Sequence, residues 1–370
     1  MTGRTGAGDV PREFRAGPSG WRGADLRATD EWLLRLSPRQ LAELSEALST
    51  ARRRGVTLLR LTVADFPLPT LAGELERIGD VLEHGRGFVL IRGIPVDRLS
   101  EAAASAVFWG LGQYLGRPVS QNADGHVLGH VRDTGRTMAD PATRGYQTRA
   151  ALPFHTDAAD LLALLCLRAA RSGGRTSLVS SAAVHDAVLK FRPDLAERLR
   201  RTHYFDRREE HAPGEPPYLA APLTARSAGR PSLRYHRCYL ESAQRFPDVP
   251  RLEPADLELF DLIDELAGSP EFRLDIDLEP GDLLLFNNHA TLHARSEFED
   301  FDAPEFKRHL LRLWLAFGDC RGPDAARHGV APRDVVRPRS PLTTRQFQAA
   351  VAAVSGAAPV AHTKPRRLPT

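Results

Sequence analysis

The stretch from Arg308 to Leu315 constrains the fold of this chain more than any other segment. Its order, Arg-His-Leu-Leu-Arg-Leu-Trp-Leu, alternates with the two-residue period of a β-strand. Arg308 and Arg312 share one face, and the other face carries leucines at positions 311, 313 and 315. If the leucine face packs beneath helices, both guanidiniums point into a barrel, where they are costly unless anions meet them. The alternative is an edge strand whose arginines are solvated.

The rest of the chain predicts a mainly β core with surrounding helices, either a barrel or a sandwich. Apolar and alternating runs predict strands over residues 87–95, 127–133, 161–170, 176–180, 272–278 and 283–287. Helical periodicity predicts helices over residues 30–51, 71–83, 99–115, 182–199 and 254–267. Ser37-Pro38 interrupts the first of these, and Ser37 is placed to cap a second helix that has Pro38 at its first position.

We expect a single domain over residues 26–320, with its β core over about 85–318. Residues 1–25 are rich in Gly, Arg and Pro and predict a disordered tail. Residues 321–370 form an extension rich in Pro, Arg and Ala, with one expected helix at Thr344–Val354.

The composition limits the function classes. The 370 residues carry a net charge of only +3, and no basic run is interleaved with aromatics, which argues against nucleic-acid binding. No segment resembles a signal peptide or is apolar enough to span a bilayer. Cys166, Cys238 and Cys320 are widely spaced, which fits a reducing compartment. We therefore expect a cytoplasmic protein that acts on a small molecule, with homo-oligomerisation left open.

A candidate metal motif lies at Phe154-His155-Thr156-Asp157. On an extended segment His155 and Asp157 point the same way, so they can supply two adjacent ligands and leave the far side of an ion open. A structural hydrogen-bonded pair in a turn is the alternative. No Gly-rich dinucleotide fingerprint, phosphate-binding loop or Gly-x-Ser-x-Gly elbow competes with this motif.

A second polar cluster follows the apolar strand Leu283–Asn287. The strand runs into Asn287, Asn288, His289 and then His293, and such groups are costly at a buried strand end unless paired or coordinated. We interpret His293 as a metal ligand and His289 as a core or second-shell histidine. Gly173-Gly174 predicts a hairpin turn, after which the Thr176 hydroxyl could share an anion with Arg308.

Taken together, these motifs resemble the taurine dioxygenase (TauD/TfdA) family of iron(II)- and 2-oxoglutarate-dependent oxygenases, within the clavaminate-synthase-like superfamily. The resemblance covers about residues 85–318 and rests on the residues Phe154-His155-Thr156-Asp157, Gly173-Gly174-Arg175-Thr176, Asn288, Thr291, His293, Arg308 and Arg312. It implies a double-stranded β-helix (jelly-roll or cupin-like) core, with Fe(II), 2-oxoglutarate and O2 as cofactor and co-substrates.

The resemblance also implies residue roles. His155, Asp157 and His293 would bind iron, Arg308 and Thr176 would hold the distal carboxylate of 2-oxoglutarate, and Arg312 would contact co-substrate or substrate. The implied reaction oxidises, most simply hydroxylates, an unactivated C–H bond and releases succinate and CO2. Asp157 favours hydroxylation over halogenation, because related halogenases lack this carboxylate. Phe286 and His289 depart from the family, which often has Trp and Arg there.

The substrate is less defined. Arg149 and Arg234, in addition to Arg312, are candidate contacts to a polar or anionic substrate, although solvated surface arginines are the common alternative. Two other functions are open: a zinc hydrolase on His155, Asp157 and His293, and a non-catalytic binding protein that keeps the fold. The hydrolase leaves both arginines of the Arg308 strand unexplained.

Overall fold

The computed structural model describes residues 19–317 except 123, 141, 212–213 and 228–229. Residues 1–18 of the expected tail lie outside the described residues. So do Cys320 and the C-terminal extension with its expected helix at Thr344–Val354. No helix in the described part of the chain combines the length and apolar character needed to cross a membrane.

Two sheets form the core. The larger runs in the order β1 (Leu33–Arg35), β2 (Phe88–Arg92), β14 (Leu283–Asn287), β6 (Leu161–Arg168), β17 (His309–Ala316) and β3 (Arg117–Pro118), with β4 (Leu128–Val131) also paired to β17. The smaller runs in the order β13 (Leu274–Ile276), β8 (Thr176–Ser180), β15 (Thr291–Arg295) and β5 (Leu152–His155). Pairing within them is antiparallel except between β1 and β2. The predicted mainly β core of the jelly-roll type is confirmed.

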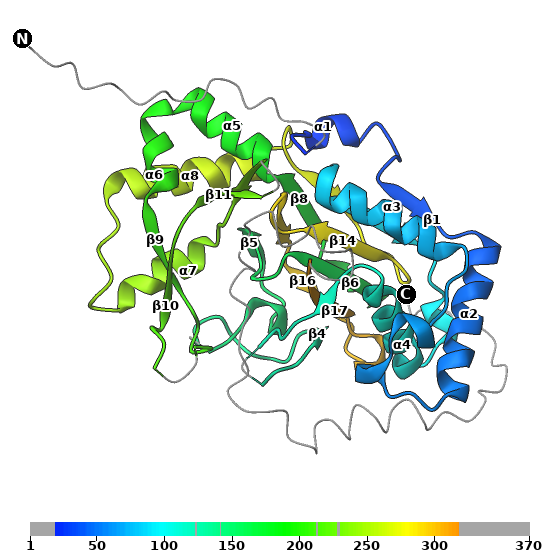
Figure 1. The fold of residues 1–370 in the computed structure, drawn as a ribbon. Helices are drawn as coiled ribbons and strands as arrows, with labels where there is room; N and C mark the ends of the chain where they lie inside the picture. The colour runs from blue at the N-terminus through cyan, green and yellow to red at the C-terminus, as the bar shows by residue number, and fades with distance from the viewer. Residues whose placement is uncertain (1–18, 123, 141, 212–213, 228–229, 318–370) are drawn as a thin grey trace, which may run out of the picture.

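Helices cover the outer faces of the sheets (Figure 1). On one side lie α2 (Pro38–Arg53), α3 (Leu71–His84) and α4 (Glu101–Gln113), and on the other α5 (Ser181–Phe191), α6 (Ala196–Arg200) and α8 (Pro254–Gly268). Short elements complete the described fold: α1 (Gly23–Leu26), α7 (Arg237–Ser242), β7 (Ser172–Gly173), β16 (Phe298–Glu299), and the hairpins β9 (Thr202–Asp206) with β10 (Tyr218–Pro222) and β11 (Thr224–Ser227) with β12 (Arg230–Leu233).

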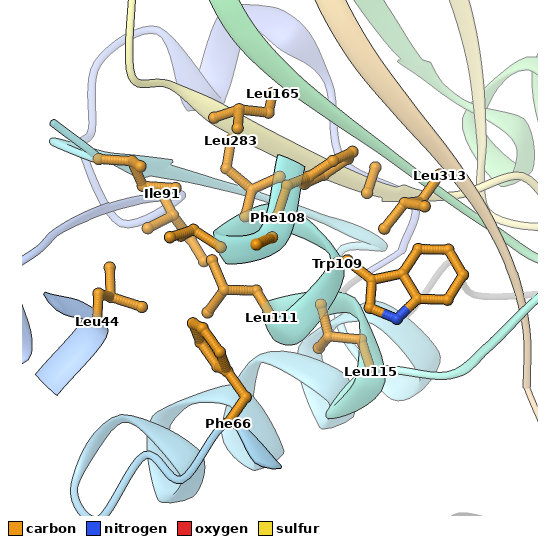
Figure 2. Close-up of a cluster of buried hydrophobic side chains, with 14 of the residues drawn as sticks. Leu44, Phe66, Ile91, Phe108, Trp109, Leu111, Leu115, Leu165, Leu283 and Leu313 are labelled. Atoms are coloured by element: carbon orange, nitrogen blue, oxygen red, sulfur yellow. The ribbon is translucent and has the colours of Figure 1, made fainter. Parts of the chain in front are cut away.

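Strand β17 adopts the predicted two-faced pattern. Its leucines at 311, 313 and 315 are fully buried against α4, in the same apolar cluster as Phe108 and Leu111 (Figure 2). On the opposite face, Leu310 and Trp314 pack in a separate cluster between the sheets. The two arginines of this strand therefore point into the space between the sheets, and the edge-strand alternative is excluded, because β17 pairs on both sides.

The N-terminal region differs from expectation in two ways. Residues 33–35 form strand β1 rather than part of a helix, because pairing with β2 outweighs the local helical spacing of three apolar residues. The chain also packs from Ser19 onward, so the tail ends before residue 25. Trp21 is 8% exposed, lies 5.1 Å from the Phe88 ring, and donates its indole N–H to the Arg86 carbonyl. The predicted Ser37 cap with Pro38 after it is present at the start of α2.

Candidate active site

Two histidines from neighbouring strands face each other in the smaller sheet. His155 ends β5, and the antiparallel register pairs it directly with His293 of β15, with ring centroids 4.1 Å apart. Asp157 follows two residues later, with Oδ1 3.8 Å from Nε2 of His155. One potential ligand atom from each of the three residues lies within 4.8 Å of the others. Two imidazoles and one carboxylate in this arrangement match the donor set that non-haem iron(II) oxygenases use.

The protonation of the two histidines suits metal binding. His155 Nδ1 lies 2.7 Å from the Pro153 carbonyl and donates to it, which leaves the Nε2 lone pair directed toward Asp157. Nδ1 of His293 is buried without a hydrogen-bond partner among the described residues. Burial lowers the pKa of His155 and lowers that of His293 to about 3, so both rings are neutral near pH 7. Neutral imidazole is the form that binds metal.

Asp157 is held through its other carboxylate oxygen. Trp314 Nε1 donates a 3.0 Å hydrogen bond to Oδ2, and Nη1 of Arg312 lies 3.6 Å from the same oxygen. Burial alone would raise the pKa of Asp157, but the positive charge of Arg312 is the largest opposing cause and holds that pKa well below its usual range. Oδ2 is thereby engaged, and Oδ1 lies on the side of His155.

The polar residues after β14 brace this centre. Asn288 Oδ1 accepts the Asp157 backbone N–H at 3.0 Å, and Asn288 Nδ2 donates to the Ala159 carbonyl. The Thr291 hydroxyl donates to the Asn287 carbonyl. His289 lies apart from the three candidate ligands, with Nε2 2.8 Å from Oδ1 of Asp160, as expected of a hydrogen-bonded core histidine.

Arg308 is the residue immediately before β17, and its side chain lines the same cavity. Its side chain is 4% exposed, and Nη1 has no hydrogen-bond partner among the described residues. Thr176, at the start of β8, lines the cavity beside it. The expected turn before Thr176 requires glycine: Gly174 has φ +71°, and a Cβ there would lie 3.0 Å from Arg308 Nε. A buried guanidinium with an unpartnered nitrogen, in a cavity that a hydroxyl also lines, is a site suited to a carboxylate.

The structure adds a residue that the sequence interpretation missed. Arg295 is 7% exposed, lines the cavity, and stands directly opposite Thr176 in the β15–β8 register. Burial lowers its pKa to about 9, and the charge of Arg308 contributes to this shift. The signal was present in the sequence, since Arg295 lies two residues after His293 and therefore shares its strand face.

Arg312 occupies the other end of the cavity. Its Nε donates to Gln121 Oε1 at 2.6 Å, and Gln121 Nε2 donates in turn to the Arg312 carbonyl. The guanidinium carbon lies 4.5 Å from the ring centroid of Tyr146. These contacts fix the side chain beside Asp157 while leaving it on the cavity wall.

The cavity has a volume of about 390 Å³. Beyond the candidate ligands, its walls include Arg144, Tyr146, His236 and Tyr239. His236 stacks on Tyr239 with ring centroids 3.5 Å apart, and Arg144 forms an ion pair with Glu210. The site is thus lined with aromatic rings and guanidiniums.

The expected contacts from Arg149 and Arg234 are not observed, because neither lines the cavity. The Arg149 side chain is exposed. Strand β12 ends at Leu233 and α7 begins at Arg237, and the turn between them presents His236 to the cavity in place of Arg234.

A second group of histidines and a carboxylate does not form a comparable centre. His130 Nδ1 and His309 Nε2 lie 2.9 Å apart, Glu101 approaches both rings, and Nη2 of Arg168 lies 3.1 Å from His309 Nδ1. Both nitrogens of His309 are therefore engaged, and a metal ion would meet the positive charge of Arg168.

Comparison with known proteins agrees with this geometry. The family model described as taurine catabolism dioxygenase TauD, TfdA family, matches residues 34–314. The chain is 33% identical over 305 residues to the FR-33289 synthase of Streptomyces rubellomurinus, covering 81% of this chain and 89% of that protein. It is 30% identical over 301 residues to the taurine hydroxylase-like protein SAT17 of Stachybotrys chartarum, covering 79% and 77% of the two chains.

A solved structure with the same fold is the non-haem iron oxygenase OrfP in complex with Fe and alpha-ketoglutaric acid. It superposes with a TM-score of 0.57 at 17% identity, covering 82% of this chain and 98% of that one. At this identity the likeness concerns the fold.

Proposed function

This chain belongs to the TauD/TfdA family of iron(II)- and 2-oxoglutarate-dependent dioxygenases, and we propose that His155, Asp157 and His293 hold its iron. The observation that carries this assignment is the convergence of their three donor atoms within 4.8 Å on a cavity wall. The unpartnered Nδ1 of His293 and the occupied Oδ2 of Asp157 fit a metal at this point.

The same cavity receives the co-substrate. Arg308 and Thr176, which both line this cavity, would hold the distal carboxylate of 2-oxoglutarate, and His155, Asp157 and His293 would hold the metal that its 2-oxo acid end binds. The unpartnered Nη1 of Arg308 supports this role, because burying that charge without an anion is unfavourable.

When bound, iron with 2-oxoglutarate and O2 supplies the oxidation of an unactivated C–H bond, with release of succinate and CO2. The protein positions the reactants. Trp314 and Arg312 keep Asp157 ionised and engage its Oδ2, so that Asp157 would offer Oδ1 to the metal. Family membership argues against both a zinc hydrolase and a non-catalytic barrel. The unpartnered Nη1 of Arg308, which neither alternative uses, argues against them as well.

The substrate is a small acidic molecule. Arg144 and Arg312 flank the part of the cavity that lies away from Arg308, and among the described lining residues Asp157 carries the one carboxylate. Because that carboxylate would bind the metal, a cationic substrate would find no other carboxylate on these walls, whereas an acidic group would meet Arg312 beside Asp157 and Arg144, which is shared with Glu210.

An anaerobic titration of the apoprotein with iron(II) and 2-oxoglutarate tests the assignment. We expect the weak visible charge-transfer band of a chelated 2-oxo acid in the wild-type protein and no band in His155→Ala. A folded wild-type protein without the band would contradict the proposal. Compounds that stimulate succinate formation can then be sought among matched acidic, neutral and cationic small molecules, and acidic compounds should provide the stimulation.

A further inference from the structure

Arg295 is a buried cation on which the charge of Asp133 acts without forming an ion pair within the described residues. Its side chain forms no ion pair within the described part of the chain, and its Nε and Nη1 atoms are buried without hydrogen-bond partners there. Such an arrangement is unfavourable unless an anion is supplied. Nothing in the metal centre needs this charge, since Asp157 is already paired with Arg312.

The position of Arg295 indicates which anion it meets. Arg295 lies on the strand face of His293 and stands opposite Thr176 in the register, where directly opposed side chains are in contact range. Arg295 and Arg308 also flank a common ring: their guanidinium carbons lie 5.0 Å and 4.9 Å from the centroid of Phe298. Both guanidiniums line the same cavity, and each has an unpartnered nitrogen.

The remaining guanidinium nitrogen of Arg295 has hydrogen-bond partners. Nη2 of Arg295 donates to the carbonyls of Thr148 and Ala150, at 2.7 Å and 2.5 Å. These carbonyls belong to the segment that precedes β5 and that contributes Tyr146, Ala150 and Ala151 to the cavity wall. Arg295 therefore links the Thr176 end of the cavity to the wall of the substrate end.

We propose that Arg295 is a second guanidinium of the co-substrate site, which together with Arg308 neutralises the distal carboxylate of 2-oxoglutarate. This inference rests on the proposed function. Two cations around one carboxylate make the site selective for a dicarboxylic 2-oxo acid over a monocarboxylic one. Because Arg295 also holds residues 148–150, occupancy of the site orders the segment that faces the substrate.

The test compares binding of two 2-oxo acids to protein loaded anaerobically with iron(II), by the charge-transfer band and by calorimetry. 2-Oxoglutarate carries the distal carboxylate and 2-oxobutyrate does not. In Arg295→Gln we expect the Kd for 2-oxoglutarate to rise about 10- to 100-fold, the range of one lost charge-assisted hydrogen bond. The Kd values for 2-oxobutyrate and for iron(II) should stay within about twofold. Arg175→Gln, which alters an exposed arginine paired with Asp277 near the same turn, is the matched control and should behave as wild type.

Two further measurements keep the inference testable if Arg295→Gln folds poorly. Arg295→Lys retains the charge and should weaken 2-oxoglutarate binding less than Arg295→Gln does. In the wild-type protein, hydrogen exchange of residues 145–151 should slow on adding 2-oxoglutarate and remain unchanged with 2-oxobutyrate.

Equal 2-oxoglutarate affinity in wild type and Arg295→Gln would overturn this inference alone and leave Arg295 as a structural clamp. Equal losses for both 2-oxo acids would also overturn it, because the effect would then not depend on the distal carboxylate. Absence of any 2-oxoglutarate binding by the wild-type protein would remove the proposed function and this inference with it.

Discussion

The indole nitrogen of Trp314 lies 3.0 Å from Oδ2 of Asp157 and donates a hydrogen bond to it. The two residues are far apart in sequence, and β17 and the segment after β5 bring them together. Trp314 is fully buried, so its ring cannot turn away, and the carboxylate is held with Oδ1 toward His155. Partners that orient a metal ligand in this way are expected to contribute to metal affinity.

Replacing Trp314 with Phe removes this hydrogen bond while keeping an aromatic ring in the core. We expect iron(II) affinity to fall about 10- to 100-fold, the usual effect of losing such a partner. Metal titration of the apoprotein measures it. Trp109→Phe is the control, because its buried indole donates to the Leu61 carbonyl in a different cluster. Equal metal affinity in the two variants would show that the Trp314 hydrogen bond is dispensable.

Arg308→Ala removes the proposed anchor of the co-substrate. The Kd for 2-oxoglutarate should rise about 10-fold or more, because a charge-assisted bidentate contact is lost. Iron binding should persist, since Arg308 contacts none of the three candidate ligands. Separate titrations with metal and with 2-oxoglutarate distinguish the two effects. An unchanged 2-oxoglutarate Kd would place the anchor at another residue.

Arg144→Gln tests the acidic substrate. With an acidic compound found by the screen, KM should increase about 10-fold through loss of one charged contact, while the Kd for 2-oxoglutarate stays unchanged. Glu210→Gln is the informative partner variant, because it frees the Arg144 guanidinium from its ion pair. In that variant KM should stay the same or decrease. A large increase in both variants would mean that the ion pair itself shapes the pocket.

His309 makes the stability of the protein depend on pH. Burial lowers its pKa to about 3, and His130 and Arg168 contribute to the shift. Since the pKa in the unfolded chain is about 6.5, the unfolded state binds more protons between these values. The stabilisation is therefore fully present above about pH 6.5 and is lost as pH falls toward 3.

Melting temperatures of the apoprotein at several pH values between 7 and 4 measure this effect. His309→Asn should show a shallower decline than wild type, and His84→Gln, at an exposed position, should match wild type. Parallel curves for His309→Asn and wild type would indicate that other groups carry the acid sensitivity.

Local sequence patterns determined much of this fold. The alternation in residues 308–315 placed leucines against helices and arginines between the sheets, because strand side chains must alternate whatever the neighbours are. The same reasoning located the segments that carry His155, Asp157 and His293, and the resemblance to a known family assigned roles to them. The interpretation of His289 as a buried histidine with a polar partner likewise followed from the cost of burying a polar group.

Other features depended on contacts between distant segments. Residues 33–35 became a strand only through pairing with β2, and Trp21 became ordered only through Phe88. Arg149 and Arg234 were expected at the cavity, whereas Arg144, His236 and Arg295 line it. The way loops and strands pack against each other decides which arginines are buried. The sequence by itself determined the strand faces and the candidate donor set. The tertiary structure decided which charges are buried without an ion pair, because desolvation depends on all neighbours at once.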